Sequence, residues 1–120
     1  IQMGYVLCDK HGSILDANPL GIRIFGIPPL EKSIGRPLAL SIRIEERSGF
    51  LDWITRVFSG YTENETIFKT MSDTQVSIKG TLLFDEELLI SATDITKQQN
   101  ELKIAHNFFK IKGFGLFAFV

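Results

Sequence analysis

Cysteine and histidine are scarce in this sequence, which has one Cys and two His among its 120 residues. Cys8 cannot form an intramolecular disulfide, and His11 and His106 are too scattered to give the ligand spacing of a metal site. We therefore predict no metal site and two solvated histidines. Low cysteine usage fits a reducing compartment, so we expect a cytoplasmic protein.

The sequence also lacks a large excess of positive or negative charge, and it lacks long apolar runs. The formal net charge is −1, so no overall field attracts nucleic acid, and we expect no nucleic-acid partner. No run reaches the roughly 18 apolar residues of a spanning helix, and the N-terminus lacks a signal-peptide pattern. Because the chain begins at Ile1, we interpret it as part of a longer protein, with no membrane segment in this fragment; whether one lies elsewhere is left open.

Catalytic motifs are absent too. The sequence has no Gly-x-Ser-x-Gly, no phosphate-binding loop and no Ser, His and Asp set that a fold would bring together. The acidic runs Glu45-Glu46 and Asp85-Glu86-Glu87 fall at a predicted helix start and a turn, where solvated carboxylates or helix-dipole partners are more common than a catalytic pair. We predict no catalytic residue and no enzyme activity in this module.

The sequence does contain a short helix bracketed between two clear signals. Asn18 suits an N-cap, Pro19 suits the first helical position, and Gly26 suits a left-handed residue at the end. Between them there is room for about two helical turns. The segment directly follows a predicted hairpin, so we expect a joint between sheet and helix at Asn18.

Hydrophobic periodicity predicts the other elements. Apolar residues at helical spacing predict a helix over Ser48–Ser59, Leu30–Ile34 is at most one turn, and Arg36–Arg47 fits either a strand or an irregular helix. The predicted strands are Met3–Asp9, Gly12–Ala17, Glu65–Thr70, Thr74–Phe84 and Glu87–Thr93. This order predicts an α+β fold, in which short helices pack on one face of a five-stranded antiparallel sheet.

Several motifs occur in a characteristic order along the chain. They are Gly12-Ser13-Ile14, Asn18, Leu20 to Gly26, Ile34-Gly35-Arg36-Pro37-Leu38 and Asp94-Ile95-Thr96. Over about residues 3–104 the chain resembles the PAS domain, a sensory module of many histidine kinases, cyclases and transcriptional regulators. The resemblance implies a PAS sensory domain over 1–96 and an exit or signalling helix, or a linker, over 97–112.

The C-terminal segment leads to two more predictions. Four residues have the 7-3-4 spacing of a two-helix contact between subunits, so we expect a homodimer; the alternative is packing of this helix on its own sheet. These residues are Ile95, Leu102, Ala105 and Phe109. The run Gly115–Val120 is similar to Gly4–Asp9, which predicts that 113–120 opens a following PAS domain.

The cofactor ligands that the resemblance implies are not found. Flavin-binding PAS domains carry a reactive cysteine in an Asn-Cys-Arg-Phe-Leu-Gln motif, where this chain has Ile34–Leu38. Haem-binding members use a histidine on or near the long helix, and Ser48–Ser59 contains none. The cofactor is therefore unknown, and Cys8, in an apolar strand, is best explained as a small buried hydrophobe.

The aromatic residues have two interpretations, ordinary core or the lining of a small-molecule pocket between helices and sheet. The best pocket candidates are Trp53, Phe58, Ile78 and Ile90. Structural or signalling roles are expected for Asn18, Gly26, Asp94, Ile95 and Thr96.

Together these observations favour a sensory and dimerisation module of a sensor histidine kinase. It would bind an unidentified small molecule or partner, and relay its state through the C-terminal helix to an output domain in the same chain. The alternative is a ligand-free interaction and dimerisation module in a diguanylate cyclase or transcriptional regulator. A small enzyme is a third interpretation, for which the sequence supplies no catalytic residues.

Overall fold

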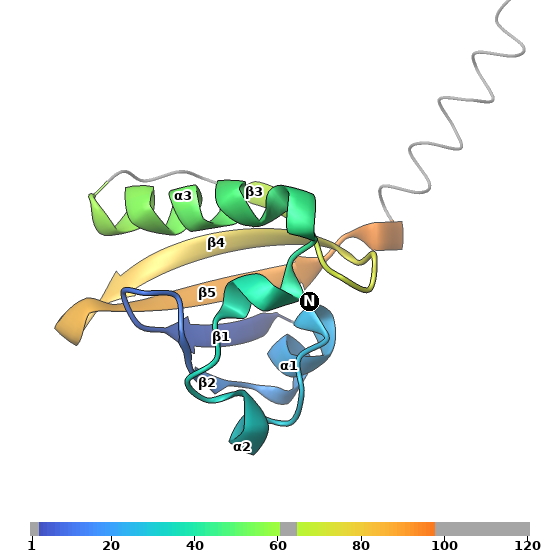
Figure 1. The fold of residues 1–120 in the computed structure, drawn as a ribbon, viewed down its shortest axis with the longest axis horizontal. Helices are drawn as coiled ribbons and strands as arrows, with labels where there is room; N and C mark the ends of the chain where they lie inside the picture. The colour runs from blue at the N-terminus through green and yellow to red at the C-terminus, as the bar shows by residue number, and fades with distance from the viewer. Residues whose placement is uncertain (1–2, 61–64, 98–120) are drawn as a thin grey trace, which may run out of the picture.

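The computed structural model describes residues 3–60 and 65–97 (Figure 1). The predicted signalling helix over 97–112, apart from its first residue, and the predicted strand over 113–120 lie outside the described residues. The elements are β1 (Gly4–Cys8), β2 (Ile14–Ala17), α1 (Pro19–Phe25), α2 (Leu30–Ser33), η1 (Leu38–Ser41), η2 (Ile44–Glu46), α3 (Arg47–Phe58), β3 (Thr66–Lys69), β4 (Gln75–Leu83), η3 (Phe84–Glu86) and β5 (Glu87–Asp94), where η marks a 3-10 helix. Within these described ranges no helix has the length and apolarity needed to cross a membrane.

The strands form one antiparallel sheet in the order β2-β1-β5-β4-β3. β3, β4 and β5 are the predicted meander, whereas β1 pairs with β5 and so brings the first strand beside the last. In that pairing Gly4 lies opposite Ala92, and Cys8 lies opposite Leu88. The predicted α+β fold with a five-stranded antiparallel sheet is confirmed.

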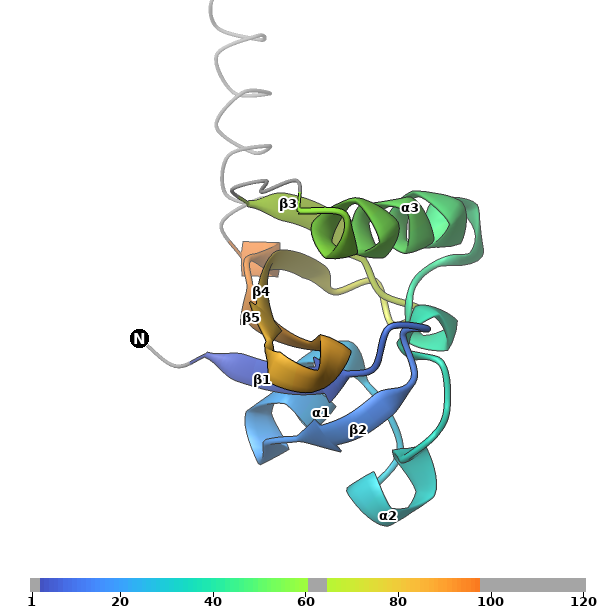
Figure 2. The same ribbon diagram turned by 90° about the vertical axis from the view of Figure 1, so that its left-hand side faces the viewer.

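The helices cover one face of this sheet, with α3 lying along the β3–β4 side and α1 beside β1 (Figures 1 and 2). The core fills the space between them. From the sheet it takes Val6, Cys8, Ile14, Val76, Ile78, Leu88, Ile90 and Ala92, and from α3 it takes Phe50, Trp53, Ile54 and Val57. Phe50 stacks on Trp53 with ring centroids 6.0 Å apart, and it meets Phe68 edge-on at 5.4 Å.

The ambiguous segment Arg36–Arg47 forms two short 3-10 helices, so the irregular-helix alternative is the correct one. Single antiparallel bridges flank η1, joining Ser13 to Pro37 and Ile42 to Thr70. Pro37 has no N–H to donate and stands just before η1, which fits a helix start better than a strand interior.

The alternation predicted for the strand over Thr74–Phe84 holds only in its first half. Val76 and Ile78 are buried, but Leu82 is 43% exposed, because it lines an open groove at the end of α3 and is not packed under the helix. Ser77, on the face predicted to be polar, is itself buried, and its hydroxyl donates to the Glu65 carboxylate.

Candidate functional site

Asn18 joins the first strand to the first helix. Its Oδ1 accepts hydrogen bonds from the backbone N–H of Gly21 at 2.7 Å and of Tyr5 at 2.8 Å, and its Nδ2 donates to the Met3 carbonyl at 3.3 Å. The first bond caps α1, and the other two hold β1. The approach is close enough that a Cβ at Gly21 would lie 2.4 Å from the Tyr5 carbonyl oxygen.

Gly26 ends α1 in the left-handed conformation, with φ of 67°. Its N–H donates to the Arg23 carbonyl at 3.2 Å, and a Cβ here would lie 2.9 Å from Ser72 Oγ in the β3–β4 turn. Both the backbone conformation and the available space therefore favour glycine at this position.

Asp94, Ile95 and Thr96 lie where β5 leaves the sheet. The N–H of Ile95 donates to the Gln75 carbonyl at 2.9 Å, and the N–H of Gln75 donates to Thr96 Oγ1 at 2.8 Å. The N–H of Thr96 donates to Asp94 Oδ1 at 2.9 Å, an arrangement typical of a helix start. Two of the three exit residues are thus bonded to the first residue of β4.

Three of the four predicted pocket residues meet in the interior between α3 and the sheet. Trp53, Ile78 and Ile90 are each at most 1% exposed. The Trp53 indole lies against β4 at Gly80, where an added Cβ would be 3.0 Å from Trp53 Cη2 and 3.1 Å from Leu88 Cδ1. The structure brings these residues together as packed core, and none of the three surface pockets described below is lined by them.

The fourth predicted pocket residue, Phe58, lies apart from the other three. It is half-buried at the end of α3 and lines an open groove of about 510 Å³ together with Lys10 and His11. At this groove Lys10 Nζ pairs with Glu86 at 3.3 Å. The groove is separate from the interior that holds the other candidates.

Two buried groups in the interior have chemistry of their own. The Trp53 indole Nε1–H has no acceptor among the described residues, and leaving such a donor unpaired costs about 1–3 kcal/mol. Burial, and then the charge of Asp9, raise the pKa of the Cys8 thiol to about 12. Cys8 is therefore a neutral thiol near pH 7 and packs as a small apolar side chain.

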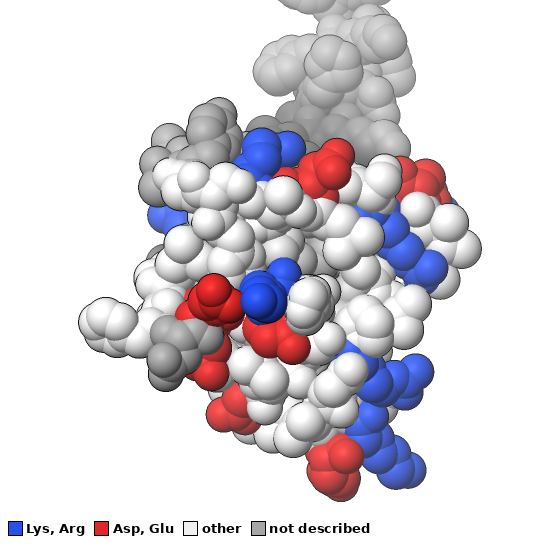
Figure 3. Space-filling model, turned by 60° about the vertical axis from the view of Figure 1, so that its left-hand side comes forward, with Lys and Arg blue, Asp and Glu red and all other residues white. Residues whose placement is uncertain are grey.

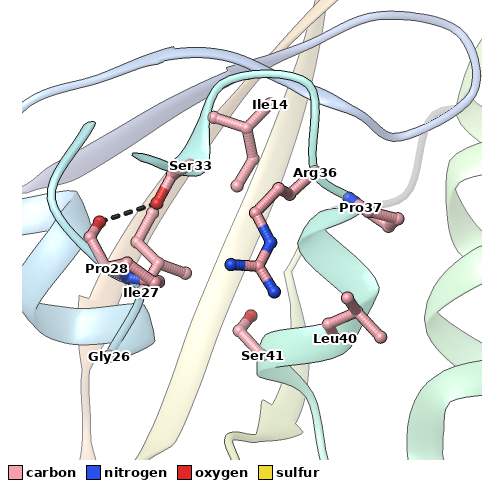
Figure 4. Close-up of a pocket in the computed structure, with 9 residues that line it drawn as sticks. All are labelled: Ile14, Gly26, Ile27, Pro28, Ser33, Arg36, Pro37, Leu40 and Ser41. Carbon is pink, nitrogen blue, oxygen red and sulfur yellow. Dashed lines mark hydrogen bonds between the residues drawn. The ribbon is translucent and has the colours of Figure 1, made fainter. Parts of the chain in front are cut away.

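Another pocket, of about 140 Å³, opens between the loop after α1 and η1 (Figure 4). Its apolar wall consists of Ile14, Ile27, Pro28, Pro37 and Leu40. Arg36 is the one charged residue of the lining, and Ser33 and Ser41 add two hydroxyls. Sequence analysis placed Arg36 only in a family motif and missed this pocket, because short segments far apart in the chain build its wall.

Several acidic side chains are bonded within the fold. Within 3–60 and 65–97 no group of three His, Cys, Asp or Glu side chains is placed to hold a metal ion. Glu46 Oε1 accepts the Lys69 N–H at 2.8 Å, and Arg43 pairs with Glu45 and Asp73. Glu46 stands at the start of α3, as predicted, and its carboxylate also ties this helix start to β3. On the face in Figure 3, acidic and basic side chains are interspersed among uncharged ones.

The chain has the fold of a PAS domain, as the sheet order and the helices on one face indicate. It is similar over 80% of its length to the PAS domain of the Cronobacter turicensis quorum-sensing receptor RpfR in complex with BDSF, with 24% identity, a TM-score of 0.68 and 96% of that chain covered. The RpfR domain has also been solved with C12:0.

Two further solved structures share the fold. One is a domain of the putative light and redox sensing histidine kinase from Haloarcula marismortui, with 17% identity, a TM-score of 0.66, and 79% of this chain and 90% of that chain covered. The other is the N-terminal domain of a diguanylate cyclase with PAS/PAC sensor from Marinobacter aquaeolei, with 12% identity, a TM-score of 0.65, and 82% and 99% covered. No protein-family model and no curated protein sequence matches the chain.

Proposed function

We propose that this chain is the sensory and dimerisation module of a cytoplasmic sensor histidine kinase. The observation that carries the proposal is the exit from β5, where Ile95 and Thr96 are both bonded to Gln75 at the start of β4. Because β5 lies between β1 and β4, a change in sheet packing moves the exit with it. Domains of the same fold from sensor histidine kinases of Geobacter sulfurreducens and Haloarcula marismortui support this host class.

The stimulus we propose is a small molecule that biases two arrangements of helices and sheet. The RpfR complexes with BDSF and C12:0 support small-molecule sensing by a domain of this shape. A ligand that touched Trp53, Ile78 and Ile90 together would require α3 to move away from β4, because the indole occupies the space over Gly80. To include Phe58 it would also have to reach the separate groove at the end of α3.

The relay is tested in the full-length protein by Thr96→Val, which keeps the side-chain shape but removes the Oγ1 that accepts the Gln75 N–H. We expect the basal autophosphorylation rate to change severalfold, in either direction, with little change in thermal stability. Thr81→Val, at an exposed threonine of β4, is the matched control. Equal rates for both variants and the wild type would show that the exit does not carry the signal.

A second candidate is the ligand-free interaction module of a diguanylate cyclase or transcriptional regulator. The packed interior around Trp53 favours it, as do apolar side chains left exposed on the uncovered sheet face, where Tyr5, Leu7, Leu83 and Leu89 line a shallow groove of about 300 Å³. Native mass spectrometry separates the two candidates. A dimer of bare chains supports the second, whereas a stoichiometric small molecule carried through purification supports the first.

A further inference from the structure

Arg36 lines the pocket of about 140 Å³ described above, which we call the α2-side pocket. Among the described residues its guanidinium makes no hydrogen bond and no ion pair. Other arginines are used inside the fold: Arg47 Nε donates to the Ile42 carbonyl at 2.8 Å, and Arg43 pairs with Asp73. Figure 4 shows the Arg36 side chain reaching across the pocket, between its two apolar sides.

The backbone that carries Arg36 is held against the edge strand β2. The N–H of Gly35 donates to the Ile14 carbonyl at 2.7 Å, and the N–H of Ile14 donates to the Arg36 carbonyl at 2.9 Å. The N–H of Leu38 then donates to the Gly12 carbonyl, also at 2.9 Å. Arg36 therefore extends from a fixed point, which lowers the ordering cost of binding through its side chain.

The two serine hydroxyls of the pocket already donate hydrogen bonds to backbone carbonyls. Ser33 Oγ donates to the Pro28 carbonyl and Ser41 Oγ donates to the Leu38 carbonyl, each at 2.7 Å. Arg36 is thus the group that can bind a ligand anion. Its planar guanidinium can donate two parallel hydrogen bonds to a carboxylate. With one cation in the lining, a single negative charge is favoured over a phosphate dianion.

The remaining wall sets the size and polarity of the ligand. The volume of about 140 Å³ is close to that of a ~150 Å³ protein cavity that holds benzene, so the pocket accommodates an apolar group of about six carbons. We propose that it binds a small monocarboxylate, with the carboxylate on Arg36 and the apolar group between Ile27 and Leu40. The inference rests on the proposed sensory function, for which it names the class of ligand and the place of binding.

The pocket is also connected to the exit by contiguous strand pairs. Ile14, in the pocket wall, lies opposite Cys8 of β1, and Cys8 lies opposite Leu88 of β5. A ligand that displaces Ile14 therefore acts on β2, which only β1 separates from β5, the strand that leads to Asp94.

The test is a titration of the 120-residue chain with sodium hexanoate, followed by amide NMR. We expect saturable shifts at Ile27, Ser33 and Arg36, and weaker binding of hexan-1-ol, which lacks the charge, and of acetate, which lacks the apolar chain. Because Arg36 is exposed, the expected affinity is modest, on the order of a millimolar dissociation constant.

Two charge-removing variants make the test specific. Arg36→Gln is expected to weaken hexanoate binding about fivefold or more. Arg23→Gln removes a charge of the same sign from an exposed residue outside the lining, and it should leave the affinity within about twofold. Equal affinities for the two variants, or shifts that do not saturate, would overturn the inference.

The failure of this inference is distinguishable from failure of the sensory function. Trp53 is the one tryptophan of the chain, so its emission reports a ligand in the interior, and we expect little change on hexanoate binding at Arg36. A change in emission that is indifferent to Arg36→Gln would overturn the pocket assignment and leave small-molecule sensing supported. Altered kinase output of Thr96→Val, without hexanoate binding, would likewise overturn only the pocket assignment.

Discussion

The Trp53 indole N–H and the Arg36 guanidinium both lack a hydrogen-bond acceptor among the described residues, but their surroundings are opposite. The indole Nε1 is buried, and the ring lies so close to Gly80 that an added Cβ there would be 3.0 Å from Trp53 Cη2. The guanidinium borders an open volume of about 140 Å³ lined by apolar side chains. An unpaired donor can therefore bind a ligand only where there is space for one. In a packed interior it only lowers the stability of the fold.

The energetics of the two regions differ for the same reason. Burial of a large aromatic ring stabilises the fold by about 1.5–3 kcal/mol, which offsets the cost of the unpaired indole N–H. Arg36 is exposed and keeps its hydration, so it contributes little to stability either way. The interior should therefore respond to mutation through stability, and the pocket through binding.

The largest expected effect is at the interior, in Trp53→Ala. Loss of the ring leaves a cavity between α3 and β4, and we expect the free energy of unfolding to fall by about 3–5 kcal/mol, measured by denaturation with circular dichroism. Phe84→Ala is the control, because Phe84 is 93% exposed, and it should change stability by about 0.5 kcal/mol or less. A loss below about 1 kcal/mol for Trp53→Ala would mean that the interior is loosely filled.

Gly80→Ala tests the same region by adding volume. The new methyl group would press on the Trp53 ring and Leu88, and we expect a loss of about 1–2 kcal/mol. The control is Gly49→Ala in α3, where a Cβ would meet Phe68 at an ordinary 3.7 Å. There the better helix propensity of alanine should raise stability by about 0.5–1 kcal/mol. A stabilised Gly80→Ala variant would show that the indole has room to move.

Asn18→Ala affects the joint that positions α1 against β1. Removal of the acceptor for Gly21 and Tyr5 should lower stability by about 0.5–2 kcal/mol. Asn18→Asp keeps an Oδ1 acceptor and should retain part of that stability. An unchanged melting curve combined with lost ligand binding would show that Asn18 is a binding residue and not a joint.

The smallest stability effect is expected for Leu40→Ala in the α2-side pocket. Leu40 is 47% exposed, so truncation should cost less than about 1 kcal/mol. Because the side chain lines the pocket, hexanoate affinity should nevertheless fall about two- to threefold, which isothermal titration calorimetry can measure. A larger stability loss with unchanged affinity would remove the contrast between the two regions.

Local patterns in the sequence predict much of this fold. The bracketed helix from Pro19 to Gly26, the long helix α3 and the five strands follow from caps, glycines and periodicity within short windows. The pairing of β1 with β5 joins residues 80 to 88 positions apart, and nothing local specifies it. The exposed end of β4 was mispredicted because periodicity marks a face of a strand and not what covers it.

The candidate site was less predictable than the fold. Asn18 and the exit residues stand out by their residue type and place in the chain. The α2-side pocket is assembled from Ile14, the loop after α1 and the segments around Arg36 and Leu40, so it exists only after folding. Arginine is common on surfaces, and its lack of a partner is a property of the folded structure.

The pairing of Gly4 with Ala92 also has a mechanical consequence. β1 starts and β5 ends at the same end of the sheet, so a pull applied through residues 3 and 97 loads the hydrogen bonds between these strands one after another. Such peeling needs less force than shearing all the bonds at once. The seam between β1 and β5 is therefore where tension in a longer protein would first open this molecule.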